Sequence, residues 1–265
     1  MRIDAHAHGD PNNWRGDPQA YIDACHEHGI EAIVLIEPLP RCLAALDRFG
    51  EFIIPVARVA MDTCGVEGIE HPIRAGCRGI KFICPRAPYG DERYWPLYER
   101  LEQLGAVAVF HTGYLGYLPE QGLESRDHPV SMEHMRAAQV ELISRRFPEL
   151  KILMAHFSNP WWEEAWKVSS SKPNIYADLS GGTAIWRSMR MWTEMFAPDG
   201  RLIENSVKKL CFGTDVRYFQ EAEPQIEPYI SFYERLFDGI GLSRQLREVV
   251  LRTNIRRLFG LSPVQ

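Results

Sequence analysis

RIDAHAH, residues 2–8, decides the fold, because it can be read as a strand or as a helix. On a strand, side chains two positions apart leave the same face, so His6 and His8 would point at one spot. On a helix, the same spacing would send the two imidazoles to nearly opposite sides. Ile3 and the small alanines that alternate with polar residues favour a strand. The two histidines could therefore chelate a metal ion together.

The composition indicates one large globular domain. The chain has 265 residues, of which 45% are hydrophobic, and this is enough for a sizeable core. Its net charge of −5 gives no basic surface for nucleic acid. The sequence has no long uncharged apolar run and no signal-peptide pattern, so we expect a soluble cytoplasmic protein without a membrane partner. Six scattered cysteines without a CxxC pair are typical of reduced core thiols.

Seven more strand-like runs follow the first, and amphipathic helical stretches separate them. Eight strand–helix repeats predict an α/β fold, a (β/α)8 TIM barrel that forms a single domain over residues 1–265. A doubly wound open sheet is the alternative, but no GxGxxG motif follows the first run. The seven runs are EAIVLIE (31–37), EFIIPVARV (51–59), RGIKFI (78–83), AVAVFH (106–111), KILMAHF (151–157), NIYADLS (174–180) and KLCFGTD (209–215).

Five metal-competent side chains stand at or near the carboxyl ends of the predicted strands, where ligands bind in either fold. The first strand ends at His6 and His8, the fifth at His111, the sixth at His156 and the eighth at Asp215. In a closed barrel these ends meet at one mouth. The sequence therefore predicts one site built from four imidazoles and a carboxylate.

Each of these residues also has a structural interpretation. His111 or His156 alone could be a hydrogen-bonded interior histidine, and Asp215 alone could cap the next segment. All of them together would require four independent coincidences of position. His26 and His28 repeat the HxH spacing inside a helical pattern, so we expect their side chains to diverge and to face solvent.

The chain resembles the amidohydrolase superfamily, in particular the branch related to aminocarboxymuconate-semialdehyde decarboxylase. This resemblance implies that His6, His8, His111 and Asp215 bind a metal and that His156 polarises or protonates the substrate. In some relatives the sixth-strand histidine is itself a ligand. A homodimer is also typical of the superfamily. The matching segments are IDAHAH (3–8), GIKF (79–82), VFHTG (109–113), RFPELKILMAHF (146–157), NIYADLSG (174–181), LCFGTD (210–215) and NIRRLFGL (254–261).

Imidazoles with one carboxylate suit Zn²⁺, and Mn²⁺ or Fe²⁺ could occupy the same site. Bound zinc lowers the pKa of water to roughly 7. We expect the resulting hydroxide to attack a carbonyl carbon while Asp215 takes a proton and returns it to the leaving group. In binuclear relatives a lysine at the end of the fourth strand is carbamylated. Here we expect the Lys81 ammonium to pair with a carboxylate such as Asp178 inside the barrel, and we therefore expect one metal ion per chain.

The substrate is expected to be a small anionic molecule, because arginines follow several strands and arginine binds carboxylates with two hydrogen bonds. Arg58 ends the third strand and is the strongest candidate, since surface ion pairs account for most loop arginines. An aromatic wall after the sixth strand is a further possibility. The predicted substrate contacts are Arg58, Lys81, Arg86, Tyr114, Arg126, Trp161 and Arg217.

Two enzymatic functions fit the same ligand set. The first is a metal-dependent hydrolase of an amide, ester or lactone. The second is a metal-dependent non-oxidative decarboxylase of a small unsaturated or aromatic acid. The short connection after His156 favours hydrolysis. A third possibility is a metal-free lactonase or a barrel that binds a ligand without turnover.

Overall fold

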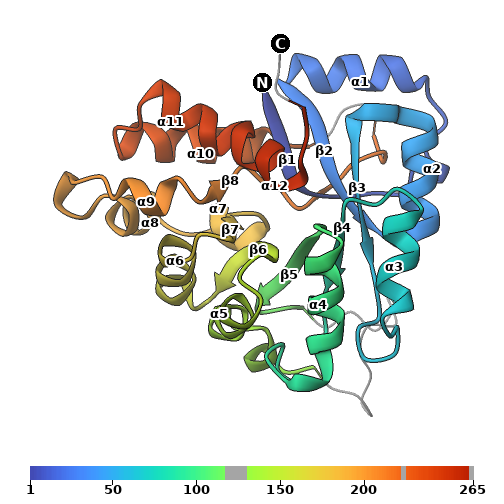
Figure 1. Cartoon of the computed structure of the whole chain (residues 1–265). Helices are drawn as coiled ribbons and strands as arrows, with labels where there is room; N and C mark the ends of the chain where they lie inside the picture. Colours follow the sequence, from blue (N-terminus) through green and yellow to red (C-terminus); the bar gives the residue numbers. More distant parts are fainter. Residues whose placement is uncertain (117–129, 222–224, 263–265) are drawn as a thin grey trace.

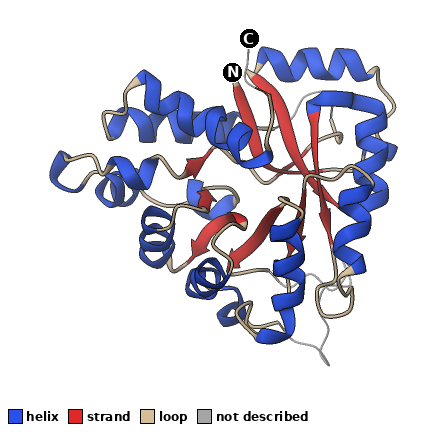
Figure 2. Cartoon of the chain, viewed as in Figure 1, coloured by secondary structure: helices blue, strands red, loops and turns tan. Residues whose placement is uncertain are grey.

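The computed structural model describes residues 1–116, 130–221 and 225–262, and Figures 1 and 2 show its strands inside a surrounding set of helices. All strands pair in parallel, in the order β8-β7-β6-β5-β4-β3-β2-β1-β9. From β1 to β8, each strand therefore lies beside its neighbour in sequence, whereas β9 lies beside β1. The strands are β1 (Arg2–His8), β2 (Ile30–Glu37), β3 (Ile53–Arg58), β4 (Gly79–Phe82), β5 (Val107–Gly113), β6 (Lys151–Asn159), β7 (Ile175–Asp178), β8 (Leu210–Cys211) and β9 (Val216–Arg217).

Helices alternate with the strands along the chain, as the strand–helix repeats predict. Helix α1 begins at Pro18, where the Asp17 carboxylate accepts a hydrogen bond from the Gln19 amide and the proline occupies the first turn. No helix in the described ranges is long and apolar enough to cross a membrane. The helices are α1 (Pro18–Glu27), α2 (Leu39–Phe49), α3 (Glu67–Arg74), α4 (Trp95–Gln103), α5 (Ala137–Arg146), α6 (Trp162–Ser171), α7 (Gly182–Ile185), α8 (Met189–Phe196), α9 (Glu204–Val207), α10 (Glu227–Gly239), α11 (Arg244–Glu248) and α12 (Asn254–Phe259).

The sheet closes on itself between β1 and the segment that carries β8 and β9. Strand β8 pairs with β7, and β9 pairs with β1. The Ala5 amide donates to the Phe212 carbonyl at 2.8 Å, and the Asp215 amide donates to the His6 carbonyl at 2.7 Å. These bonds join the first strand to the last, so the predicted barrel is confirmed and the open sheet is excluded.

Alternate residues of the strands fill the inside of the barrel, as the pleat requires. The inner layer includes Ile3 and Ala5 of β1, Val34 of β2 and Val109 of β5, and Phe259 of α12 packs against it. The other strand face packs against the surrounding helices. Because α12 covers the amino-terminal end of the barrel, the carboxyl ends of the strands form the open end.

The last helical region of the described chain is not one continuous α-helix. It is divided by a π-helical stretch, Val249–Thr253, between α11 and α12. The Val250 carbonyl in this stretch accepts the Phe212 amide at 3.0 Å, and the Asn254 side chain donates to the Leu210 carbonyl at 2.6 Å. The distortion thus satisfies polar backbone groups of the short strand β8, a tertiary requirement that helical periodicity does not reveal.

A buried carboxylate holds the closure together. Asp4 has no solvent exposure, and burial raises its pKa to about 7. Its Oδ1 accepts the amides of His6 (3.1 Å) and Thr214 (3.0 Å). Its Oδ2 accepts the hydroxyls of Thr214 (2.6 Å) and Tyr218 (2.9 Å). One side chain therefore joins β1 to the segment after β8.

Asp4→Ala should destabilise the protein strongly, because it leaves four donors in the interior without an acceptor. We expect the free energy of unfolding to fall by about 3–5 kcal/mol. Tyr218→Phe removes one donor and its bond, and should cost about 1 kcal/mol. Urea unfolding followed by tryptophan fluorescence measures both. A loss for Asp4→Ala no larger than that for Tyr218→Phe would contradict this role.

Candidate metal centre

A bulge in β1 turns its two histidines into the barrel mouth. The register of β1 against β2 shifts between Asp4 and Ala7. Before the shift, Ala5 belongs to the inner layer, whereas Ala7 packs with the outer layer against the helices. Strict alternation from Ala5 would have placed His6 outside. The extra residue reverses the alternation, so His6 and His8 both line the cavity.

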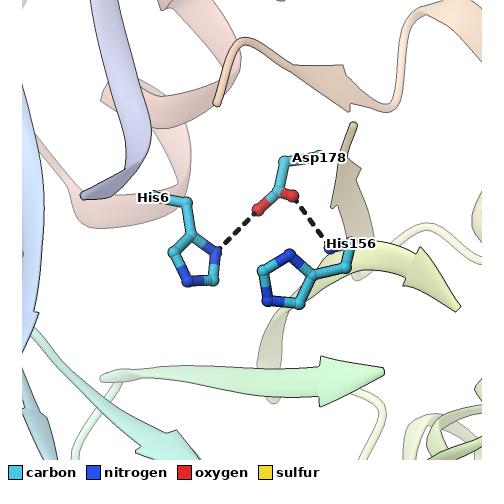
Figure 3. A group of neighbouring side chains, drawn as sticks. All are labelled: His6, His156 and Asp178. Atoms are coloured by element: carbon cyan, nitrogen blue, oxygen red, sulfur yellow. Dashed lines mark hydrogen bonds and ion pairs between the residues drawn. The ribbon is translucent and has the colours of Figure 1, made fainter. Parts of the chain in front are cut away.

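Hydrogen bonds at Nδ1 direct the Nε2 atoms of both histidines toward Asp215, and His6 Nε2 also contacts Lys81 Nζ at 3.4 Å. His8 Nδ1 donates to the Ile36 carbonyl at 2.7 Å, since a carbonyl can only accept. His6 Nδ1 contacts Asp178 Oδ2 at 3.3 Å (Figure 3). The two Nε2 atoms lie 3.6 Å (His6) and 3.2 Å (His8) from Asp215 Oδ1. This outer support is what metal-binding histidines usually have.

The three donor atoms form a compact group that fits one divalent cation. Ligand atoms of His6, His8 and Asp215 all lie within 4.8 Å of one another. A second group, His6 with His156 and Asp178, satisfies the same criterion. In that group, however, the Asp178 oxygens already accept hydrogen bonds from His6, the His156 amide and the Ser180 hydroxyl. Asp178 therefore supports the His6 ring and the backbone of His156, as Figure 3 shows, and Asp215 is the better ligand.

Electrostatics at the mouth also favour a cation. Burial would raise the pKa of Asp215. The electrostatic interaction with His156 and a hydrogen bond from His8 nevertheless hold this pKa well below its usual value. Burial lowers the pKa of His8, yet its bonds to Asp215 and Glu37 raise it to about 9. The Asp215 carboxylate thus favours a positive partner beside it, either protonated His8, whose Nε2 lies 3.2 Å from Oδ1, or a cation.

His111 and His156 stand beside this group. The His156 ring lies 4.6 Å from the His6 ring and 4.6 Å from the His111 ring, measured between centroids. His111 Nε2 donates to the Tyr114 carbonyl at 3.2 Å, which leaves its Nδ1 without the proton. Burial lowers the pKa of both rings. All five side chains predicted from the strand ends therefore face one cavity, with three of them in the compact group.

His156 and Asp215 reach the cavity through unusual backbone. Both have positive φ, 67° in each case, which is uncommon for residues other than glycine. Strained conformations of this kind concentrate at functional sites. Gly181 provides the room beside them, because a Cβ at this position would lie 3.2 Å from His156 Nδ1 and 3.4 Å from Asp215 Oδ2.

The cavity has a volume of about 920 Å³ and carries positive side chains around the metal-competent group. Arg58, Lys81 and Arg217 all line it, as predicted for substrate contacts. Lys81 is buried, with Nζ 3.4 Å from His6 Nε2. In the described ranges no direct ion pair joins Lys81 to Asp178, whose oxygens accept hydrogen bonds from His6, His156 and Ser180. Burial lowers the pKa of Lys81 to about 8, and attraction to the Asp178 and Asp215 carboxylates opposes this shift.

Three other predicted substrate contacts, Arg86, Tyr114 and Trp161, do not line the described cavity. Arg86 is exposed, and its backbone amide donates a hydrogen bond to the Asp62 carboxylate. The Tyr114 side chain is exposed. The Trp161 ring stacks against the Arg136 guanidinium, and the distance from the guanidinium carbon to the ring centroid is 4.5 Å. A position after a strand end gives no direction for a loop side chain. Arg126 lies outside the described residues.

The sequence analysis did not identify two residues that support the candidate metal site. Ser180 contacts both Asp178 and His156. Glu37, at the end of β2, accepts the Gly9 amide at 3.0 Å and lies 3.8 Å from His8 Nδ1. Both follow the same rule as the ligands, because both stand at or just beyond a strand's carboxyl end. That position was the available signal.

The family model described as amidohydrolase matches residues 3–261, so the chain belongs to the amidohydrolase family. No curated protein matches the sequence significantly.

A solved structure from Pseudomonas putida, assigned as a 2-pyrone-4,6-dicarboxylic acid hydrolase, is 20% identical, with a TM-score of 0.65 over 100% of this chain and 99% of that chain. The 2,6-dihydroxybenzoate decarboxylase from Rhizobium is 15% identical, with a TM-score of 0.63 over 98% of each chain. The 5-carboxyvanillate decarboxylase from Sphingomonas paucimobilis is 10% identical, with a TM-score of 0.65 over 99% of each chain. The family predicted from the sequence is confirmed, and these TIM-barrel structures share the fold.

We expect the purified protein to bind one equivalent of Zn²⁺ per chain, because the compact group has one set of donors. Asp178→Asn should weaken zinc binding by roughly 10–100-fold through the loss of outer support for His6. His26→Ala, on the exposed side of α1, is the matched control and should leave the affinity unchanged. Competition with a chromophoric chelator measures the affinity, and elemental analysis the stoichiometry. Two equivalents per chain would contradict the single site.

Proposed function

We propose that the protein is a metal-dependent hydrolase that acts on an amide, ester or lactone of a small carboxylate-bearing molecule. The observation that carries the proposal is the compact group of His6, His8 and Asp215 at the floor of a cavity lined by Arg58 and Arg217. Two imidazoles and a carboxylate suit Zn²⁺, and Mn²⁺ or Fe²⁺ are also compatible. His111 is proposed as the fourth ligand.

The residues have separate tasks in this scheme. The metal, when bound, supplies Lewis acidity that activates water and polarises a carbonyl group. Asp215 accepts a proton from the attacking water and returns it to the leaving oxygen or nitrogen. His156 lies beside Asp215 and His111, within reach of the substrate carbonyl. The guanidinium groups of Arg58 and Arg217 hold the substrate carboxylate.

Non-oxidative decarboxylation is the second candidate for the same site. Two observations favour it: structures with this fold include decarboxylases of aromatic acids, and Lys81 places a buried positive charge 3.4 Å from His6 Nε2. That charge would stabilise the electrons left on the substrate when CO₂ departs. The same carboxylate recognition serves both reactions.

A substrate panel separates the two reactions. We expect the zinc-loaded protein to hydrolyse at least one carboxylated lactone, ester or amide without release of CO₂. Removal of the metal by a chelator should abolish turnover, and readdition should restore it. Release of CO₂ from aromatic or enoic acids, with no hydrolysis, would select the decarboxylase. Full turnover in metal-free protein would overturn the metal-dependent scheme.

Arg217→Gln should impair binding of a carboxylated substrate because it removes a charge-assisted hydrogen bond. A bond of this kind contributes about 1.5–3 kcal/mol, so KM should rise roughly 10–100-fold. The matched control is the neutral analogue of the same lactone, whose KM should not change. An equal rise for both would assign Arg217 a structural role and remove it from carboxylate recognition.

A further inference from the structure

The hydroxyl of Ser180 stands between Asp178 and His156. Ser180 Oγ donates to Asp178 Oδ1 and lies 3.1 Å from His156 Nδ1. The backbone carbonyl of Ser180 is 3.4 Å from the same nitrogen. The amides of Ser180 and His156 also donate to Asp178 Oδ1, at 3.0 and 2.9 Å. Asp178 and Ser180 are almost completely buried, so their hydrogen bonds are shielded from bulk solvent.

The position of one proton follows from this arrangement. A serine hydroxyl has a single proton, and here the Asp178 carboxylate receives it. Ser180 Oγ can then only accept from His156, and the Ser180 carbonyl can only accept as well. His156 Nδ1 must therefore carry a hydrogen atom to satisfy both contacts. Nε2, on the ring edge that points away from Asp178 in Figure 3, becomes the nitrogen available to the cavity.

We propose that Ser180 is a positioning residue that fixes the orientation of the His156 ring, with a proton on Nδ1 and with Nε2 presented to the cavity. Ser180 does not act as a nucleophile. It does not line the cavity, and its hydroxyl is committed to Asp178. In a Ser–His–Asp triad the histidine stands between the other two residues, whereas here the serine stands in the middle. The proposal rests on the proposed function only where it calls His156 a catalytic group.

Nuclear magnetic resonance tests the proton position without a substrate. Two-bond ¹H–¹⁵N correlation spectra of histidine-labelled, zinc-loaded protein show which ring nitrogen carries hydrogen, and His156→Gln identifies the signal. In the wild type, we expect the His156 proton on Nδ1. In Ser180→Ala, where only the weaker carbonyl contact remains, we expect a measurable population with the proton on Nε2.

Ser169→Ala is the matched control, because Ser169 is equally buried but donates within α6 to the Ala165 carbonyl, at 2.8 Å. It should leave the His156 signal unchanged. With any lactone that the wild type hydrolyses, Ser180→Ala should lower kcat about tenfold, the loss of one hydrogen bond, with little change in KM. A wild-type proton on Nε2, an unchanged tautomer in Ser180→Ala, or the same shift in Ser169→Ala would overturn the proposal. Because the spectra need no turnover, failure of the hydrolase assignment would leave this test intact.

Discussion

The closure of the barrel depends on the Asp4 carboxylate, which accepts four hydrogen bonds and faces no cation in the described ranges. An unpaired buried carboxylate is expensive, and the four donors offset that cost. Two of them belong to Thr214, which precedes Asp215, and a third is the amide of His6. The same side chain that joins the first strand to the last therefore sets the separation of two proposed ligands. Fold and site share one constraint.

The ligand positions are built from local departures from regular structure. A bulge redirects His6 and His8, and left-handed backbone redirects His156 and Asp215. Each departure has a free-energy cost of about 1–3 kcal/mol, which regular hydrogen bonding and packing around the mouth must offset. A rigid barrel can hold such residues because the strands beneath them are fully paired. At the open end, this strain lets side chains from different strands converge.

Much of the fold could be predicted from the sequence, because apolar runs and helix caps are local signals. The chemical identity of the site was also predictable, since histidines and an aspartate at strand ends can be recognised without coordinates. The residues that support the histidines of the site could not be predicted from the sequence. Ser180 matters only through Asp178 and His156, which come from different strands. Arg86 and Trp161 were misplaced because a loop side chain takes its direction from tertiary packing, and the π-helical stretch arises from a need of β8.

The long sequence separation of the joined segments affects when the barrel can close during synthesis. Asp4 and Thr214 are 210 residues apart in the chain. The residues up to Thr214 must therefore be synthesised before β1 can bond to the segment that follows β8. Contacts of such long range form slowly. Until then β1 has one unpaired edge, and the histidines on it lack their carboxylate partner. Chain fragments that end before Asp215 therefore lack the compact group of His6, His8 and Asp215.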